Sequence, residues 1–169
     1  RGDFEGPYNT YIYNNTIYVE EDIEACFNFR YTIDGVFIAN NIFHITGDAA
    51  NITKAKKERE PVDAFPQDIV YQNNLYLKNS NHPKGMLISD SEKIIGDASF
   101  RNPGGYDAKD YIPGNTELIK DKGIEITKIP GDEVGLKAGF EVDEDFFGNP
   151  IINKPDMGAV ELIGATSAK

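Results

Sequence analysis

The sequence of 169 residues has no tryptophan, one cysteine and two histidines. A single cysteine, Cys26, excludes an internal disulfide bond. The two histidines show no zinc-ligand spacing, and the chain contains no Ser-His-Asp set and no phosphate-binding loop. No apolar run approaches the roughly 20 residues that a membrane-spanning helix needs, so we expect no membrane span.

Basic residues are also scarce, with 17 Lys and Arg against 28 Asp and Glu and a formal net charge of −11. This charge disfavours attraction to nucleic acid or to an anionic membrane, so nucleic acid is not an expected partner. The sequence does contain 40% hydrophobic residues, including nine Tyr and ten Phe. That is the composition of one globular domain with an aromatic-rich core.

Asparagine pairs recur in matching apolar surroundings at Asn14-Asn15, Asn40-Asn41 and Asn73-Asn74. Successive pairs are 26 and 33 residues apart, within the range of roughly 20 to 50 residues that is typical of solenoid repeats. The alternative is three unrelated hairpins with asparagine in their turns. Because the apolar frames match as well, we favour an all-β solenoid, a parallel β-helix of about three coils.

The repeat predicts which side chains point into the core. Apolar residues alternate with period two around each pair, as in a strand with one buried face. The expected inward column is Thr10, Val36, Ile69, Ile12, Ile38, Tyr71, Ile17, Phe43 and Tyr76. We expect the second asparagines, Asn15, Asn41 and Asn74, to adopt the left-handed backbone angles of a bend and to hydrogen-bond to one another as a ladder.

The longer interval between the second and third pairs, residues 47–67, is expected to form a loop that leaves the coil. Lyases that act on uronic acids need cations to neutralise the substrate carboxylate. Basic residues of this loop could form such a substrate-binding wall together with Arg30, or they could form a solvated loop. They are Lys54, Lys56, Lys57 and Arg59.

An acidic group follows the first asparagine pair. Its carboxylates could bind calcium, which takes several oxygen ligands, and a solvated acidic corner is the commoner arrangement. The predicted calcium ligands are Glu20, Glu21, Asp22 and Glu24.

Tyr18, His44 and Leu77 share a column that faces away from the predicted core. Aromatic faces bury the CH groups of sugars, so Tyr18 and His44 are candidates for binding a glycan. Simple lateral packing under a loop is the alternative that we prefer for this column.

The last part of the chain resembles the closing segment of secreted bacterial right-handed β-helix proteins, a group that includes polysaccharide lyases and glycoside hydrolases. Four blocks carry the resemblance in the same order as in those proteins. They are Gly-Asp-Ala-Ser-Phe-Arg-Asn-Pro at 96–103, the segment at 110–123, Asp-Phe-Phe-Gly-Asn-Pro at 145–150, and Pro-Asp-Met-Gly-Ala-Val-Glu at 155–161. Ala98, and the segment at 115–117, depart from the usual pattern.

The resemblance implies one structural domain, with right-handed coils over residues 1–90 and an irregular capping segment over 91–169. An uncovered solenoid end exposes strand edges and apolar surface, so we expect the closing segment to plug it. Candidates for the plug are Phe100, Phe146, Phe147 and Met157. We expect Asp145 and Asp156 to fix turns rather than to act in catalysis.

The resemblance also implies a secreted, periplasmic or cell-surface protein whose partner is a polysaccharide or another glycan. The chain is then the C-terminal part of a polysaccharide lyase or glycoside hydrolase whose main catalytic residues lie upstream, and no catalytic residue is assigned within it. The alternative is a non-catalytic glycan-binding or surface-display module. The first coil has little covering material, so self-association through it is a further expectation.

Overall fold

The computed structural model describes residues 7–30, 33–54, 67–82, 90–133 and 142–163, and it is nearly all β-structure. The described helices are short: two 3₁₀ turns, η2 and η3, and one α-helical turn, α1. No described helix has the length and apolar character needed to cross a membrane. The helical turns are η2 (Asn79–Asn81), η3 (Ala108–Tyr111) and α1 (Thr116–Ile119).

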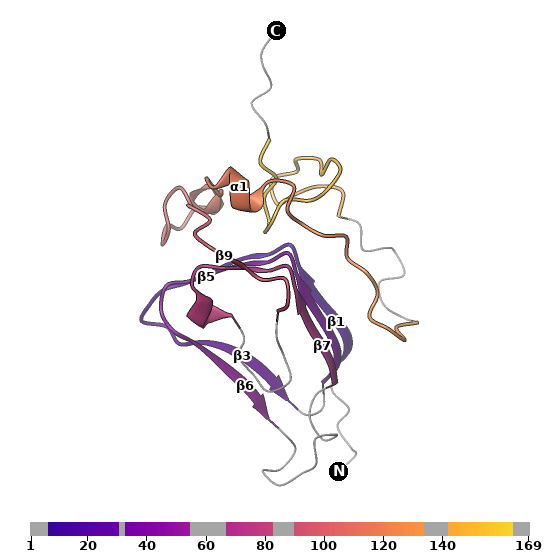
Figure 1. Cartoon of the computed structure of the whole chain (residues 1–169). Helices are drawn as coiled ribbons and strands as arrows, with labels where there is room; N and C mark the ends of the chain where they lie inside the picture. The colour runs from indigo at the N-terminus through magenta and orange to yellow at the C-terminus, as the bar shows by residue number, and fades with distance from the viewer. Residues whose placement is uncertain (1–6, 31–32, 55–66, 83–89, 134–141, 164–169) are drawn as a thin grey trace.

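Every described strand pair is parallel, and the strands form three sheets (Figure 1). The chain visits the sheets in a fixed order, and we call one passage through them a circuit. The first circuit is β1 (Tyr8–Tyr13), β2 (Thr16–Val19) and β3 (Ala25–Arg30), and the second is β4 (Asp34–Ala39), β5 (Ile42–Ile45) and β6 (Ala49–Lys54). β7 (Gln67–Gln72) and β8 (Leu75–Tyr76) follow, and β9 (Ile94–Ile95) pairs with β8.

The all-β prediction is confirmed, and the pairing register agrees with the sequence repeat. Val36 lies between Thr10 and Ile69, and Phe43 lies between Ile17 and Tyr76. Segment 47–67, however, is not a loop throughout, because residues 49–54 form β6 and pair with β3. Residues 55–66 lie outside the described part of the chain.

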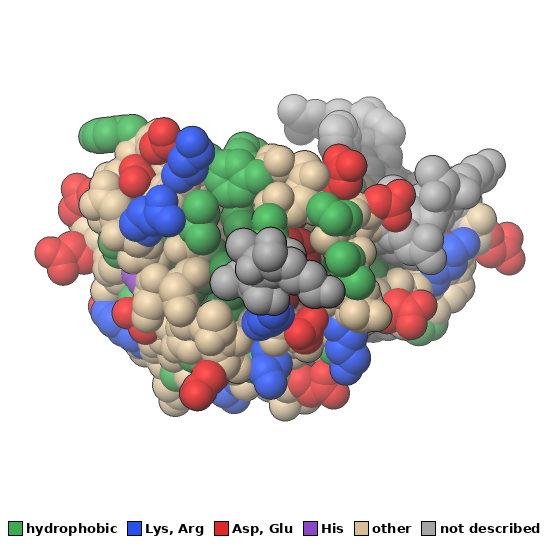
Figure 2. Space-filling model, turned by 90° about the horizontal axis from the view of Figure 1, so that it is seen from above, with side chains coloured by type: hydrophobic (Ala, Val, Ile, Leu, Met, Phe, Trp, Pro, Cys, Tyr) green, Lys and Arg blue, Asp and Glu red, His purple; other side chains and the backbone are tan. Residues whose placement is uncertain are grey.

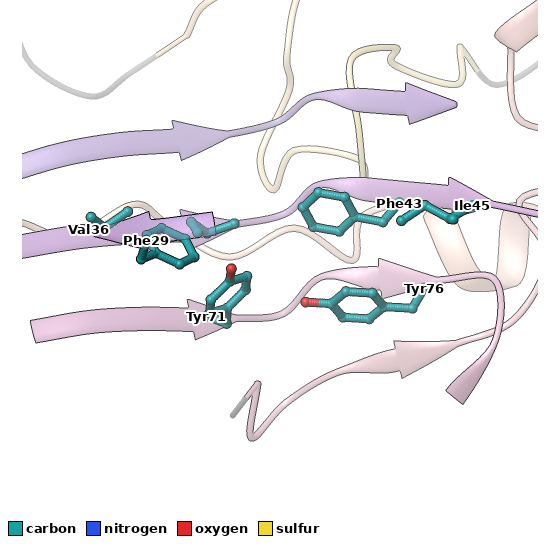
Figure 3. Close-up of a cluster of buried hydrophobic side chains, with 7 residues drawn as sticks. Phe29, Val36, Phe43, Ile45, Tyr71 and Tyr76 are labelled. Carbon is teal, nitrogen blue, oxygen red and sulfur yellow. The ribbon is translucent and has the colours of Figure 1, made fainter. Parts of the chain in front are cut away.

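The inward faces of the three sheets enclose one core (Figure 3). Phe43 stacks on Tyr76 with ring centroids 5.3 Å apart, and Phe29 meets Tyr71 edge to face. The predicted column fills most of this core, because Val36, Ile38, Phe43, Tyr71 and Tyr76 are buried and Ile17 and Ile69 pack against them. The first circuit is more open: Ile12 is 38% exposed, whereas its register partner Ile38 is 3% exposed.

The two asparagines of each pair have different roles, which corrects the expectation for the bend. The first asparagines carry the left-handed backbone, with φ of 53° at Asn14, 56° at Asn40 and 54° at Asn73. Asparagine tolerates this conformation better than most residues with a Cβ. The bend therefore lies one residue earlier than the sequence analysis expected.

The second asparagines form a directed series of hydrogen bonds. Asn41 Oδ1 accepts from the backbone N–H of Asn15 at 3.0 Å and from its Nδ2 at 2.9 Å. Asn74 Oδ1 accepts from the N–H of Asn41 at 3.1 Å and from its Nδ2 at 2.9 Å. Asn15 and Asn41 thus each donate to the asparagine of the next circuit along the chain. We call Asn15, Asn41 and Asn74 the asparagine series.

The closing segment lies along the outer faces of two sheets, which corrects the expectation of a plug across the helix end (Figure 1). Phe100 and Met157 are buried against the outward side chains Ile42 and Leu75. Ile129 packs on Phe37 and Ala39 of β4, also on the outside. Phe146 and Phe147 are 69% and 37% exposed, so they are not part of an apolar plug.

The asparagine series ends on a buried carboxylate. Asp90 Oδ2 accepts hydrogen bonds from the N–H of Asn74 at 3.1 Å, from its Nδ2 at 2.9 Å and from the Tyr76 hydroxyl at 3.2 Å. Its Oδ1 accepts from the N–H of Glu92 at 3.1 Å. A carboxylate oxygen accepts hydrogen bonds and donates none. Asp90 therefore accepts from Asn74 and needs no acceptor of its own, so the series can end there.

We expect Asp90→Ala to lower the free energy of unfolding by about 2–4 kcal/mol, because it leaves the Asn74 N–H and the Tyr76 hydroxyl buried without an acceptor, whereas Asn74 Nδ2 keeps the Ile38 and Gln72 carbonyls. Asp90→Asn keeps one oxygen but turns an NH₂ group toward a donor, so we expect a loss of about 1–2 kcal/mol. Urea unfolding measures both. Glu92→Ala, at an exposed carboxylate two residues away, is the control and should stay within about 0.5 kcal/mol. An Asp90→Ala variant as stable as the control would contradict this role.

Candidate functional site

Tyr18 and His44 lie side by side on the outer face of β2 and β5, as the repeat predicts. They are register partners, and their rings stack with centroids 5.4 Å apart and an interplanar angle of 27°. His44 is only 5% exposed, because Phe100 of the closing segment lies over it at a centroid distance of 5.0 Å. This is the arrangement expected for lateral packing, and it leaves Tyr18 as the ring nearer the surface.

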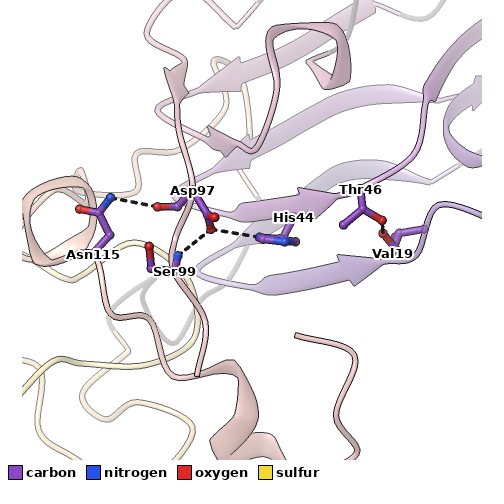
Figure 4. Close-up of polar contacts among 6 residues, drawn as sticks. All are labelled: Val19, His44, Thr46, Asp97, Ser99 and Asn115. Carbon is purple, nitrogen blue, oxygen red and sulfur yellow. Dashed lines mark hydrogen bonds and ion pairs between the residues drawn. The ribbon is translucent and has the colours of Figure 1, made fainter. Parts of the chain in front are cut away.

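Asp97 lies beside His44 in the network shown in Figure 4. Its Oδ1 is 3.8 Å from His44 Nδ1, which is too long for a hydrogen bond, and it accepts from the Ser99 N–H at 2.7 Å. The Asp97 carbonyl accepts from Asn115 Nδ2 at 2.9 Å. Burial lowers the pKa of His44 from its ordinary 6.5, although the charge of Asp97 opposes that shift. His44 is therefore neutral at neutral pH, which fits a packing role.

An aromatic cleft of about 320 Å³ opens beside Tyr18. Tyr111 of η3 approaches Tyr18 with ring centroids 5.4 Å apart, and the exposed ring of Phe146 borders the same cleft. The remaining wall is small side chains: Thr16, Ala108, Ala159 and Val160. Rings from three separate segments thus surround one hollow, the arrangement that buries the CH faces of a sugar ring.

A carboxylate stands at the edge of the aromatic cleft. The pKa of Tyr18 is raised by desolvation and then by the charge of Glu20. Gly104 turns over both groups with φ of +87°, and a Cβ at this position would lie 3.1 Å from Glu20 Oε1 and 3.4 Å from Tyr18 Oη. The absence of a side chain at Gly104 leaves that space open. The cleft therefore combines aromatic faces with a nearby hydrogen-bond acceptor.

Two more clefts lie between the closing segment and the first circuit. One, of about 280 Å³, is lined by Asn14, Asn15, the segment 144–146 and the segment 158–161. The other, of about 630 Å³, is lined by Asn14, the segment 124–126 and the segment 153–155. Both also include Val142 and Ile151. We call the three the aromatic, middle and far clefts.

Two carboxylates of the middle cleft differ in acidity. Burial raises the pKa of Glu161, and nearby carboxylates raise it further. Partial burial also acts to raise the pKa of Asp145, but hydrogen bonds from Asn149, Glu161 and Phe147 outweigh it and hold that pKa below 3.8. Carboxylates whose pKa values are pushed apart can serve as a catalytic acid and base.

The hydrogen bonds of Asp145 favour a turn-forming role instead. Its Oδ1 accepts from the N–H groups of Phe147 and Asn149, and its Oδ2 accepts from Asn149 Nδ2 and the N–H of Glu161, each at 2.8 Å. Asp156 similarly accepts from the N–H groups of Asp121 and Leu162. Both carboxylates fix the backbone of the closing segment, as the sequence analysis expected.

The other predicted site residues are the basic wall and the acidic group. Arg30 and Lys54 are register partners at the ends of β3 and β6, and Lys56, Lys57 and Arg59 lie outside the described residues. Glu20, Glu21, Asp22 and Glu24 are all exposed. Within the described ranges, no group of three or more His, Cys, Asp or Glu side chains is arranged to hold a metal ion. The basic wall and the calcium site therefore stay predictions.

No known protein-family model matches the chain. The chain is similar to a lacto-N-biosidase of Bifidobacterium longum subsp. longum, with 29% identity over an alignment of 179 positions that covers 95% of this chain and 10% of that protein. It spans about a tenth of the length of that glycoside hydrolase.

The sequence analysis missed two of the three rings of the aromatic cleft. Tyr111 lies in a block recognised only by its resemblance to closing segments, and Phe146 was assigned to the plug. Neither has a periodic pattern that would place it near Tyr18. The only sequence signal was the adjacent pair Phe146-Phe147 in a Gly- and Pro-containing segment, where two neighbouring rings cannot both be buried easily.

We predict that His44 makes the stability of the protein sensitive to mild acid. The unfolded chain binds a proton at a pKa near 6.5, whereas the folded protein binds it only at lower pH. The unfolded state therefore holds more protons below pH 6.5, and the free energy of unfolding falls as the pH drops from there toward the folded pKa. His44→Phe keeps a ring under Phe100 and removes this titration. Urea unfolding between about pH 7.5 and 5 should show a shallower decline for the variant, and equal declines would contradict the prediction.

Proposed function

We propose that this chain is the C-terminal part of an exported glycoside hydrolase built on a right-handed parallel β-helix, and that this part contacts the glycan. The observation that carries the proposal is the aromatic cleft, in which Tyr18, Tyr111 and Phe146 meet at the surface beside an acidic side chain. The likeness to a lacto-N-biosidase supports a hydrolase rather than a lyase. The proposal of export rests on the resemblance of the closing segment to those of secreted proteins.

The β-helix part of the proposal has three supports. The chain passes through the same three parallel sheets in the same order. Equivalent apolar residues of successive circuits pair in register, as expected for stacked coils. The asparagine series then corresponds to the ladder of such a helix.

The C-terminal position is supported by the direction of the asparagine series. Asn41 Oδ1 and Asn74 Oδ1 each accept from the preceding asparagine, whereas Asn15 is exposed. An asparagine on a preceding coil could donate to Asn15 in the same way. At the other end, Asp90 receives the donors of Asn74. Self-association through the same open edge would use the same surface.

We place the principal catalytic residues outside this chain. Glycoside hydrolysis needs two carboxylates with free oxygens on either side of the scissile bond. All the hydrogen bonds of Asp145 are made to its own closing segment. These hydrogen bonds occupy both oxygens of Asp145. They therefore also favour the second candidate function, a glycan-binding module without activity. Turnover of glycans by the longest natural polypeptide that contains this sequence separates the two.

Binding to a glycan panel tests the shared part of both functions. We expect this chain to bind at least one member of a panel of neutral and acidic polysaccharides, measured by affinity electrophoresis and then by calorimetry. Tyr18→Leu keeps apolar volume but removes the aromatic face, so we expect affinity to fall about five- to tenfold, or roughly 1–1.5 kcal/mol.

Tyr106→Leu is the matched control, because this tyrosine is fully exposed and lines none of the three clefts. The control should bind as the unmodified chain does. A folded chain that binds no member of the panel would refute a glycan-contacting role. Equal losses of glycan affinity in Tyr18→Leu and Tyr106→Leu would indicate that the glycan does not bind in the aromatic cleft. Parallel titrations in calcium and in EDTA test the predicted calcium site.

A further inference from the structure

Neighbouring clefts share lining residues and so adjoin one another, and we call the three together the groove. The far and middle clefts have Asn14, Val142 and Ile151 in common. The middle and aromatic clefts have Phe146, Ala159 and Val160 in common. The floor is supplied by neighbouring residues of the first circuit, Asn14 and Asn15 and then Thr16 and Tyr18. The hollow is therefore elongated along the first circuit rather than confined to one sugar-sized pocket.

We propose that this groove binds an extended, uncharged oligosaccharide across several successive subsites, with Phe146 as the stacking platform between the aromatic and middle clefts. The inference rests on the proposed glycan-contacting function and goes beyond it, because it assigns a groove for a linear chain. A single pocket around Tyr18 would bind one terminal unit only.

The groove walls have the mixed character that sugars require. The far cleft has aliphatic side chains at Ile124, Ile126 and Ile151, interspersed with the carboxylates of Glu125 and Asp143. Aliphatic surface can bury sugar CH groups while carboxylates accept from hydroxyl groups. On the face seen in Figure 2, green apolar side chains lie among red acidic and blue basic ones.

The charge of the groove selects against acidic glycans. Among the described lining residues are five carboxylates and one basic side chain, Lys154; the carboxylates are Glu125, Asp143, Glu144, Asp145 and Glu161. The aromatic cleft has no basic residue among its described lining. Uronates or sulfates along this path would meet like charge with little compensation, which costs binding free energy.

Phe146 is held in place although its ring is exposed. Its backbone N–H donates to the Ala159 carbonyl at 3.0 Å, and its ring meets Phe147 edge to face with centroids 5.3 Å apart. The preceding residue, Asp145, accepts four hydrogen bonds from the same turn and from residue 161. An exposed ring on a fixed backbone loses little freedom when a ligand stacks on it, which favours binding.

Dependence of affinity on ligand length tests the groove. Calorimetry uses disaccharides, tetrasaccharides and hexasaccharides of the cello-, xylo-, manno-, galacto- and chito- series, together with hexasaccharides of polygalacturonate as the acidic probe. We expect affinity to rise at least about tenfold from disaccharide to hexasaccharide in a neutral series, with weaker binding of the acidic hexasaccharide.

Two variants at exposed positions locate the subsites. Phe146→Ala should weaken hexasaccharide binding more than disaccharide binding, because it removes the platform that joins two clefts. Val142→Asp, at the boundary of the middle and far clefts, should lower hexasaccharide affinity to the disaccharide level and leave the disaccharide unaffected. Tyr106→Ala is the control and should leave every affinity unchanged.

The outcomes separate this inference from the function on which it rests. Equal affinities for disaccharide and hexasaccharide, tighter binding of the acidic probe, or a length dependence that survives both groove variants would overturn the groove while leaving glycan contact intact. Failure of the neutral and acidic probes and of the polysaccharide panel alike would remove the glycan-contacting function itself.

Discussion

The asparagine pair at each bend is the constraint on which the rest of the structure depends. The first asparagine takes the left-handed backbone that turns the chain between two sheets. The second is tied to its neighbour in the next circuit by a backbone and a side-chain hydrogen bond. A net contribution of about 1 kcal/mol for each such bond is modest, but the bonds also fix the register of the circuits. A slip by one residue would turn every inward side chain outward.

The first asparagines also determine where the closing segment lies. Asn40 Nδ2 donates to the Ile124 carbonyl at 2.8 Å, and the N–H of Ile124 donates back to Asn40 Oδ1 at 2.9 Å. Asn73 Nδ2 donates to the Lys122 carbonyl at 2.8 Å. These side-chain amides point outward from the bends and hydrogen-bond to backbone groups of the closing segment. The segment is therefore held along the side of the sheets, and the apolar contacts of Met157 and Ile129 complete that attachment.

Much of the strand region could be predicted from the sequence because it repeats. Val36, Ile38, Phe43 and their partners stand at the same offsets from each asparagine pair, and period-two alternation states which face they occupy. Which asparagine takes the left-handed backbone was assigned wrongly, because both members of the pair tolerate it and composition does not separate them. β6 was missed because its partner β3 lies outside the matching frames on which the repeat was recognised.

The candidate site was much harder to predict, because it depends on contacts between segments that share no pattern. Tyr18 could be assigned to an outward column, but the position of Tyr111 and Phe146 beside it depends on how the closing segment returns to the first circuit. Motif order indicates that such a segment exists and does not specify the surface on which it packs. The plug expectation failed for this reason: outward-facing Ile42 and Leu75 offered apolar surface on the side of the sheets.

The return of the closing segment to the first circuit explains where the groove lies. The N–H of Gly158 donates to the Asn40 carbonyl at 2.8 Å, and the N–H of Ala159 donates to Thr16 Oγ1 at 3.1 Å. A Cβ at Gly158 would lie 2.6 Å from Ile42 Cδ1, so glycine permits this close approach. Ala159 and Val160 then form one wall of the groove, while Thr16 and Tyr18 form its floor. Because these floor residues face outward, a further circuit stacked on β1, β2 and β3 would leave the groove uncovered and lengthen it. The position of the groove therefore depends on the close approach that Gly158 permits.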